Sequence, residues 1–559
     1  MLLKDFKVKI PSGSRIQKKD NQYYVYKPVA YIYKKDKKQS IEKRVCIGRK
    51  IDDEYMIPNT EYTKYYDDVK RELNNPRVFC DTLKIGNMLI IKKILKNTSL
   101  DDVIEVHDDK KDMIINLASY LIIEGNSSFQ HYPSFAYNHN IIGALYSDSY
   151  ICEFLKSFSD KEKEVFLDAW NRINNKQDKL YINYDSTNMN TSSSGIELAE
   201  YGHAKKDEGL PQVNISLASS LRDNTPLYYE IYPGSIIDNT EFNSSANKLI
   251  SYGYKDIGFI LDRGYFSKTN IDYLRDKGFS FILMIKENSI FLKTFKMEMG
   301  DKIKLDYTYF LEAHQVYGVT IKAKIYDKDK KASFIHLYYD EQNASIERAN
   351  ILTNIKKMES ELNIRLDSKD VSVKHMSKVD KYNSYFNIHY IDEYMVSFSL
   401  KKKVIQDLIN NCGYFSLITS EQMTCSEALD IYRDRDSVEK LFMILKSEMD
   451  MEKFKVQTDA SLRAKFHIAF IASIIRNEIY KVSKQLKNTT KDKKSYTVPA
   501  IIKELDKIEC TRDINDVYQR RYSLTAKQKK ILEQFGIKES DINKEVDSIN
   551  KSANTNGGK

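Results

Sequence analysis

The sequence predicts a mixed α/β protein, and the order of its apolar segments carries this prediction. Between about residues 177 and 288 the pattern predicts three strands, a helix, a strand, a helix and a strand. Such an order describes a mixed sheet of modest size with helices packed on it. A further apolar strand, GYFSLITS at 413–420, returns to the same character after a long and less regular stretch.

The composition is that of a soluble globular protein with a mild basic excess. The chain has 559 residues, of which 42% are hydrophobic and 30% charged, and a chain of this length divides into several domains. Its 88 Lys and Arg residues stand against 79 Asp and Glu, for a formal net charge of +9. This excess permits a polyanionic partner without requiring one.

The cysteines and apolar runs indicate a cytoplasmic protein. None of the six cysteines forms a C-x-x-C pair, and no His lies at metal-ligand spacing from them, so we expect reduced side chains and no zinc site. The N-terminus, MLLKDFKVKIPSGS, lacks the apolar stretch of a signal peptide. The best apolar run, FHIAFIASII, is about half the length needed to span a bilayer. We therefore expect no membrane partner.

The N-terminal region, residues 1–100, is expected to combine a β-hairpin with helix. YYVYKPVAYIYKK and SIEKRVCIGRK have the aromatic and β-branched character of strands joined across a KDKKQ turn. Four cations flank the second strand, and they indicate either a DNA-contacting face or a solvated edge: Lys43, Arg44, Arg49 and Lys50. This region is the expected site of DNA-end binding. Residues 101–176 follow as a helical region.

The expected core occupies residues 177–288 and 412–490. Its strands are predicted at 179–187, 210–221, 226–235, 256–264, 279–287 and 413–420, and its helices at 239–254, 267–277 and 459–486. Residues 289–411 are predicted to be a mostly β insertion with its own small sheet. Residues 491–559 are expected to be helical and to end in a disordered tail, NKSANTNGGK.

The stretch YRDRDSVEKLFMILK, residues 432–446, predicts a helix that begins near Ser426 and has an unusual polar edge. At about 100° per residue, four polar side chains fall within an arc of roughly 60° beside the apolar stripe: Tyr432, Arg435, Glu439 and Lys446. Asp436 lies about 60–80° off this arc and is interpreted as a surface residue.

Three carboxylates stand at positions where an α/β sheet keeps its ligands. Asp185 is expected near the end of the first core strand, Asp262 at the end of DIGFILD, and Glu439 on the helix after the last core strand. Each Asp has a simpler interpretation as a turn cap. Together they supply hard oxygen ligands of the kind that holds two magnesium ions roughly 3.5–4 Å apart for phosphodiester displacement. Nearby cations would relieve their mutual repulsion and would also bind phosphate.

The same residues resemble a known family. The spacing Tyr-x2-Arg-x3-Glu-x6-Lys at residues 432–446 is similar to the signature of DDE transposases of the insertion sequence 4 family. YDST around Asp185 resembles that family's first Asp segment, and LDRGYFS around Asp262 resembles the second. The segment YGHAKKDEGLPQVNISLASSLRDNTPLYYEIYPGSIIDNTEF looks like the one that follows the first Asp. SIEKRVCIGRK looks like the N-terminal portion of the insertion sequence 1634 group. The resemblance extends from about residue 23 to about residue 536.

This resemblance implies a fold, an activity and partners. The fold would be a ribonuclease-H-like (retroviral-integrase-like) catalytic core with a mostly β insertion between the second Asp and the Glu. The activity would be metal-dependent cleavage at the terminal inverted repeats of an insertion sequence, then strand transfer into target DNA. Relatives often use a hairpin intermediate. The partners would be double-stranded DNA and a second copy of the chain in a synaptic homodimer. The protein would be bacterial and cytoplasmic, and nucleoid-associated when bound to DNA.

The resemblance also implies roles for residues. Two Mg²⁺ ions, which Mn²⁺ would replace, would be held by Asp185, Asp262 and Glu439. The terminal phosphate and nearby backbone would be held by Tyr432, Arg435 and Lys446.

Several further residues are weaker candidates for DNA contact. Arg263 follows the second Asp and is as well suited to a structural salt bridge as to a phosphate. His203, Lys205 and Lys206 lie in a Gly-flanked loop near the first catalytic strand, where we expect DNA contact. A basic run after the signature helix is either a DNA surface or a solvated face: Lys453, Lys455, Arg463 and Lys465.

Two alternatives remain open. A catalytically silent, transposase-derived DNA-binding protein or repressor would bind DNA without nicking it, and a lost carboxylate would favour it. A structure-specific nuclease with the same core would cut DNA and never join it.

Overall fold

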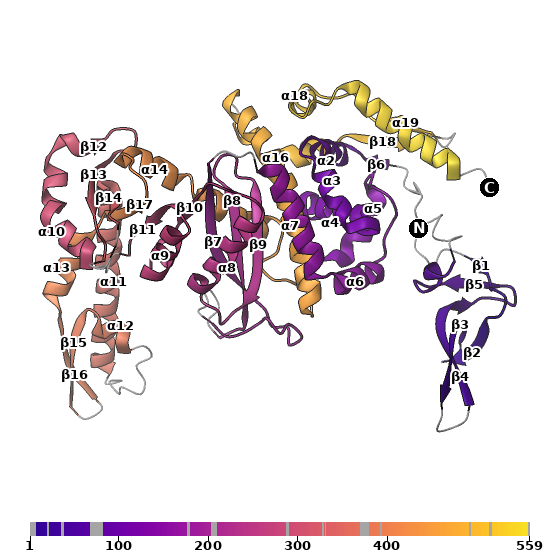
Figure 1. The fold of residues 1–559 in the computed structure, drawn as a ribbon, viewed down its shortest axis with the longest axis horizontal. Coiled ribbons are helices and arrows are strands. Elements are labelled where there is room, and N and C mark those ends of the chain that lie inside the picture. The colour runs from indigo at the N-terminus through magenta and orange to yellow at the C-terminus, as the bar shows by residue number, and fades with distance from the viewer. Residues whose placement is uncertain are drawn as a thin grey trace.

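The computed structural model confirms a mixed α/β chain. It describes residues 7–19, 22–34, 39–66, 82–175, 179–202, 209–286, 290–326, 329, 331–368, 379–391, 394–490, 493–513 and 517–556. Within these residues the strands form sheets of nine, five, three and two strands (Figure 1). None of the described helices is both long and apolar enough to cross a membrane.

The nine-stranded sheet contains all the predicted core strands. Its order is β12-β13-β14-β17-β11-β10-β7-β8-β9. The strands that match the predicted core are β7 (Leu180–Asn190), β8 (Gln212–Ser220), β9 (Pro226–Pro233), β10 (Ile257–Leu261), β11 (Ser280–Met284) and β17 (Tyr414–Thr419). β7, β8 and β9 form an antiparallel meander, while β10 lies parallel to both β7 and β11. This order is consistent with a ribonuclease-H-like core.

The two faces of β7 carry different chemistry because side chains alternate along a strand. Leu180, Ile182 and Tyr184 point to one face, where the Tyr184 hydroxyl contacts Ser245 of α8 (Asp238–Ser251). Helix α9 (Lys268–Asp276) packs beside α8. The other face of β7 turns toward α14 (Cys425–Arg433) and α15 (Asp436–Met443). The apolar face thus builds the core and leaves the polar face for the signature helices.

The expectation of a mostly β insertion with its own sheet is corrected by the structure. Strands β12 (Phe310–Leu311), β13 (Val316–Ala323) and β14 (Ser333–Tyr339) continue the core sheet beyond β17. Only β15 (Phe386–Ile391) and β16 (Tyr394–Leu400) pair by themselves. Most of the described residues of this segment are helical, in α10 (Ile290–Leu305), α11 (Glu341–Ser368), α12 (Val379–Asn383) and α13 (Lys402–Asn411). The physical reason is that β17 would otherwise be an open edge, and β14 covers it with an antiparallel ladder.

The N-terminal hairpin is confirmed and belongs to a small β unit. Its five strands lie in the order β1-β5-β4-β3-β2 and have their own core of Val25, Ile47, Met56 and Tyr62. The strands are β1 (Val8–Lys9), β2 (Arg15–Lys19), β3 (Gln22–Lys34), β4 (Gln39–Lys50) and β5 (Tyr55–Pro58). The expected boundary at residue 100 shifts, because β6 (Thr82–Lys84) already pairs with β18 (Glu509–Arg512), which also pairs with β19 (Tyr518–Arg520).

The predicted helical regions pack around the long helix α16 (Asp459–Asn488), which is buried along most of its length (Figure 1). The N-terminal helices around it are α2 (Gly86–Asn97), α3 (Leu100–Ile104), α4 (Lys111–Glu124), α5 (Tyr132–Asn138), α6 (Asp148–Ser157) and α7 (Asp160–Asn174). The C-terminal helices are α17 (Val498–Leu505), α18 (Ala526–Gln534) and α19 (Glu539–Asn556). Most of the expected disordered tail is therefore helical, because α19 continues to Asn556 and buries Val546 and Ile549.

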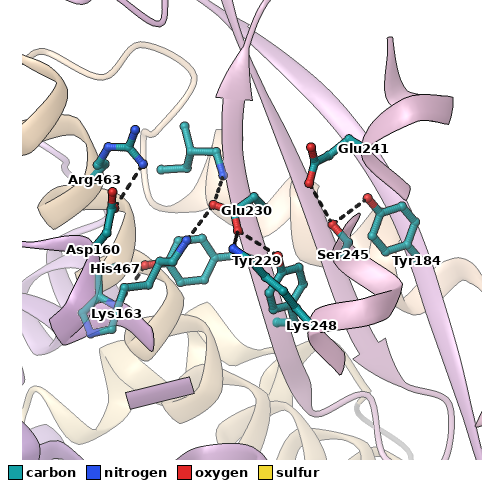
Figure 2. A network of polar contacts seen from close by, with 12 residues as sticks. Asp160, Lys163, Tyr184, Tyr229, Glu230, Glu241, Ser245, Lys248, Arg463 and His467 are labelled. Carbon is teal, nitrogen blue, oxygen red and sulfur yellow. Dashed lines mark hydrogen bonds and ion pairs between the residues drawn. The ribbon is translucent and has the colours of Figure 1, made fainter. Parts of the chain in front are cut away.

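A buried ionic network ties strand β9 to the helices on either side (Figure 2). The Glu230 carboxylate lies 2.6 Å from the ammonium groups of both Lys163 and Lys248, and it accepts a hydrogen bond of 2.8 Å from the Tyr228 hydroxyl. Burial raises the pKa of Glu230, but the two lysines outweigh burial and lower it to about 2. The charge is thus kept inside the fold only because two cations from α7 and α8 surround it.

Replacing Glu230 with Gln is expected to destabilise the core by about 3–5 kcal/mol, because Lys163 then keeps a buried charge without its partner. Urea unfolding of Glu230→Gln, followed by circular dichroism, measures this loss. The matched control is Glu164→Gln, which removes an exposed carboxylate from α7, next to Lys163. Since the folded pKa is depressed, the stabilisation is present above the usual value of 4.5 and is lost as pH falls toward about 2. An equal deficit at pH 7 and pH 3 would contradict this account.

Candidate active site

Asp185 lies on the face of β7 that turns toward the signature helices. The expectation that it lies near the end of its strand is corrected, because β7 continues for five more residues to Asn190 and these pair with β8. Its carboxylate accepts a 2.8 Å hydrogen bond from the backbone N–H of Ser186 and is partly exposed. The carboxylate therefore sits on a rigid central strand, where its position is well fixed.

Asp262 follows β10 directly, as the sequence predicts. In the parallel ladder Ile260 pairs with Asn183, so Asp262 falls on the same face of the sheet as Asp185. The backbone N–H of Arg263 donates to its Oδ1 at 2.7 Å, because Asp262 caps the short helical turn Arg263–Tyr265. The capping role and the functional role therefore coexist at this residue.

The signature segment is a broken helix and not one continuous helix. A capping box formed by Thr424 and Glu427 starts α14 two residues before the expected Ser426. The chain leaves α-helical hydrogen bonding at Asp434–Arg435, resumes as α15, and ends in a π-helical turn, Ile444–Glu448. Because of this break, residues before and after it are not related by the roughly 100° per residue of one continuous helix.

Arg435 joins the candidate carboxylates. Its guanidinium lies 2.6 Å from Glu439 Oε1 and 3.6 Å from Asp262 Oδ2, and it lies 5.2 Å from the centre of the Tyr432 ring. The Tyr432 hydroxyl donates to Asp262 Oδ1 at 3.4 Å. Four of the predicted site residues therefore meet at one point, and Asp185 is close enough to act on the charge of Arg435.

The electrostatics of this cluster follow from burial and charge. Burial opposes the charge of Arg435, but Tyr432, Asp262, Glu439 and Asp185 outweigh it and raise the pKa of the guanidinium. Burial is also the main cause that raises the pKa of the Tyr432 hydroxyl, so this group stays a hydrogen-bond donor. The carboxylates remain accessible, since the Asp262 and Glu439 side chains are 37% and 52% exposed while Arg435 is 13% exposed.

Lys446 lies further along β7. Its ammonium group donates to Thr187 Oγ1 at 2.7 Å and to the Asn188 carbonyl at 2.9 Å. It borders a cavity of about 1030 Å³ whose walls come mainly from residues 187–195 and 452–457. The exposed side chains of Lys453 and Lys455 belong to this wall. The π-helical turn is what directs Lys446 toward the strand and the cavity rim.

The sequence reasoning missed the polar contacts that fix α15 on the sheet. The buried Asn183 amide donates to Ser437 Oγ at 2.6 Å, and the hydroxyls of Ser219 and Ser437 lie 3.4 Å apart. Asn183 also reaches the carbonyl of Asp434, at the break between the helices, at 3.5 Å. The sequence does hold a signal that could have predicted this contact, namely an Asn inside an apolar strand, two residues before the first candidate Asp.

The remaining candidates are placed less centrally. Arg263 is exposed on the turn after Asp262, a position compatible with either a phosphate or a carboxylate partner. Asp436 is exposed, as expected. His203, Lys205 and Lys206 fall outside the described residues.

The donor set of the site suits a divalent metal in kind. Three carboxylates from three elements supply the oxygen ligands that Mg²⁺ prefers. In the described part of the chain, however, no three His, Cys, Asp or Glu side chains lie close enough together to hold an ion as they stand. Arg435 takes up the charge of Asp262 and Glu439 instead. The chemistry of the site fits a metal, and Arg435 would have to turn aside for the three carboxylates to share one.

Residues 177–475, more than half of the chain, match the family model of the transposase DDE domain. The chain belongs to this family. The match spans every core strand, both Asp segments and the signature helices, so this DDE-domain protein keeps its three carboxylates within the matched region.

Comparisons with solved structures and with curated proteins give two further findings. A piggyBac transposase synaptic complex with hairpin DNA, solved by cryo-electron microscopy, aligns with 82% of this chain and 82% of its own, at 10% identity and a TM-score of 0.35. No curated protein matches the sequence.

The contact between Asn183 and Ser437 is expected to hold α15, and with it Glu439, in place. A double-mutant cycle of Asn183→Ala and Ser437→Ala should give a coupling energy of about 0.5–1.5 kcal/mol, since each single change removes the same buried hydrogen bond. Thermal or urea unfolding of the four proteins measures it. Strictly additive effects would show that the two side chains do not depend on each other.

Proposed function

We propose that this chain is an active DNA transposase that cleaves at the terminal inverted repeats of an insertion sequence and joins the ends to target DNA. The observation that carries the proposal is the meeting of Asp262, Glu439, Arg435 and Tyr432, beside Asp185, inside a transposase DDE domain. Two acids come from neighbouring parallel strands and one from the helix above them. Such a set of convergent acids suits metal-dependent phosphodiester chemistry.

The metal-binding part of the proposal concerns the three acids. Asp185, Asp262 and Glu439 would hold two Mg²⁺ ions, with Mn²⁺ as a substitute, and bound ions would activate the attacking oxygen and stabilise the leaving oxygen. Each acid is carried by an element that packs on the core sheet. Small side-chain movements would therefore bring the carboxylate oxygens together.

The cations of the site have two tasks in this proposal. Arg435 neutralises Asp262 and Glu439 in the free protein, and the same guanidinium is suited to a DNA phosphate once the carboxylates have another counter-ion. Tyr432 supplies a protonated hydroxyl beside it. Lys446, with Lys453 and Lys455, lines the adjoining cavity, which we propose as the path of a DNA strand away from the reacting phosphate.

Finer assignments belong to the same proposal. The protein would be a member of the insertion sequence 4 family and of its 1634 group, and would act as a synaptic homodimer in a bacterial cytoplasm, at the nucleoid. The β unit of residues 7–66 would contribute DNA-end binding, and residues 177–288 with 412–490 would form the catalytic core.

Loss of one carboxylate is expected to abolish cleavage without abolishing binding. Asp185→Ala and Glu439→Gln should eliminate Mg²⁺-dependent nicking of a duplex that carries the element's ends, because each removes a ligand and leaves the DNA-contacting cations in place. Gel electrophoresis measures nicking and joining, and anisotropy measures binding. Undiminished nicking by either variant would refute the catalytic assignment. Nicking without any joined product in the wild type would indicate a nuclease, and binding without nicking would indicate a repressor.

Replacement of Arg435 should change the response of the free protein to Mg²⁺. In Arg435→Ala, Asp262 and Glu439 lose their counter-ion and repel each other, so the melting temperature without metal should fall. Added Mg²⁺ should then raise the melting temperature at lower concentration than in the wild type, because no guanidinium competes for the carboxylates. Arg433→Ala, which removes an exposed cation on the other side of the break, is the matched control. Identical Mg²⁺ dependence in all three proteins would contradict the competition.

A further inference from the structure

The N-terminal β unit has one packed face and one open face. Val25, Ile47 and Met56 turn to the packed face, where Tyr62 covers them. Side chains alternate along each strand, and the register shift beside Val25 places both Ile47 and Gly48 opposite it, so Arg49, which pairs with Tyr24, turns to the other side of the sheet. The cross-strand register therefore identifies the residues that share the open face.

Two rows of paired residues define the middle of the open face. In one row Gln17, Tyr24 and Arg49 pair side by side on β2, β3 and β4. In the next row Arg15 pairs with Tyr26. The Arg44 guanidinium lies 5.8 Å from the centre of the Tyr26 ring, which places it on the same side.

The open face, defined by this register, carries five cations, several tyrosines and one carboxylate, that of Glu42, which pairs with Tyr31. The pairings Lys9–Tyr55 and Lys19–Gln22 extend it to the edge strands. Its charged and aromatic members are Lys9, Arg15, Lys19, Arg44, Arg49, Glu42, Tyr24, Tyr26, Tyr31 and Tyr55. All five cations are exposed.

Most of the positive charge of the open face is uncompensated, since one carboxylate stands against five cations. Glu42 is the single carboxylate in the sequence of the five strands, and Arg15 and the Tyr31 hydroxyl already bind it, at 3.3 and 3.0 Å. Among the described residues, Lys9, Lys19, Arg44 and Arg49 form no ion pair with a carboxylate. A surface that only needs solvation usually mixes both signs of charge. A sheet face that carries mainly cations beside tyrosine hydroxyls is suited to bind a polyanion.

The dimensions of the open face favour a duplex over a single strand. Five strands spaced about 4.8 Å apart make a surface roughly 19 Å wide. This width is enough to reach phosphates on both sides of a groove about 12 Å across. Tyr24 and Tyr26 are partly buried, and the hydroxyl of the exposed Tyr31 is bound to Glu42.

We propose that the open face of the N-terminal sheet binds the sugar-phosphate backbone of duplex DNA. The proposal rests on the proposed function and deepens it by naming the surface that holds the DNA outside the catalytic core. Phosphate contacts position a protein without reading sequence, so the open face contributes affinity and not the choice of the terminal repeat.

The test compares two double variants of the full chain. Arg44→Ala/Arg49→Ala removes two cations from the open face, and Lys18→Ala/Lys43→Ala removes two exposed cations that turn to the packed side. Anisotropy titrations over a range of salt would use a duplex with the terminal repeat, a scrambled duplex and a single strand. The open-face variant should bind both duplexes several-fold more weakly, and its salt slope should fall by roughly 0.9 for each phosphate that the variant no longer neutralises.

The variant Arg44→Lys/Arg49→Lys is the control for a folding defect. It keeps both charges and should retain most of the affinity and the full salt slope, because the slope counts neutralised phosphates and Lys binds phosphate as a point charge. Equal reductions of affinity in the two alanine variants would overturn the proposal, as would a reduction confined to the single strand or unchanged binding by the open-face variant. If the wild type neither binds duplex nor nicks it, the proposed function itself fails. If the wild type does both and the open-face variant matches it, only this surface is wrong.

Discussion

Repulsion between acids is the constraint on which the candidate site depends. Asp262 and Glu439 both bind the Arg435 guanidinium at the edge of a packed core, and neighbouring carboxylates repel each other unless a cation lies between them. Arg435 supplies that cation in the free protein, with Tyr432 beneath it and Asp185 within electrostatic reach. The two carboxylates are therefore paired with a cation and partly exposed before any substrate or metal arrives. In our account this is a preorganised site whose counter-ion is exchangeable.

The fold places the acids through backbone pairing more than through side-chain contacts. Parallel pairing of β10 with β7 brings Asp262 to the face of Asp185, and the meander β7-β8-β9 makes β7 an interior strand. The helix that carries Glu439 is fastened by Asn183 to the same strand. On the far side of the meander, Glu230 binds lysines from two helices and fixes the outer strand. The β unit of residues 7–66 has its own small core, so its open face is built independently of these contacts.

Much of the core was predictable from local sequence, because apolar strands bounded by turn residues and capped helices leave clear patterns. The strand that ends at Asp262 and the meander around the RDNT turn are examples. Features that depend on distant pairing were not predictable. No local pattern shows that β14 would cover the edge of β17, which is why the insertion was expected to stand apart. Helix periodicity likewise could not show the break at Asp434 or the π-helical turn that directs Lys446 toward Thr187. The gathering of Tyr432, Arg435 and Glu439 was predicted because these residues lie close to one another in the chain.

The most direct test of the central claim is to locate Mn²⁺ by anomalous scattering in crystals of the full chain bound to a duplex that carries the element's end. Our account predicts two ions between Asp185, Asp262 and Glu439, with Arg435 turned from the carboxylates to a DNA phosphate. Ions bound elsewhere, or an Arg435 that still bridges Asp262 and Glu439 beside the bound DNA, would contradict it.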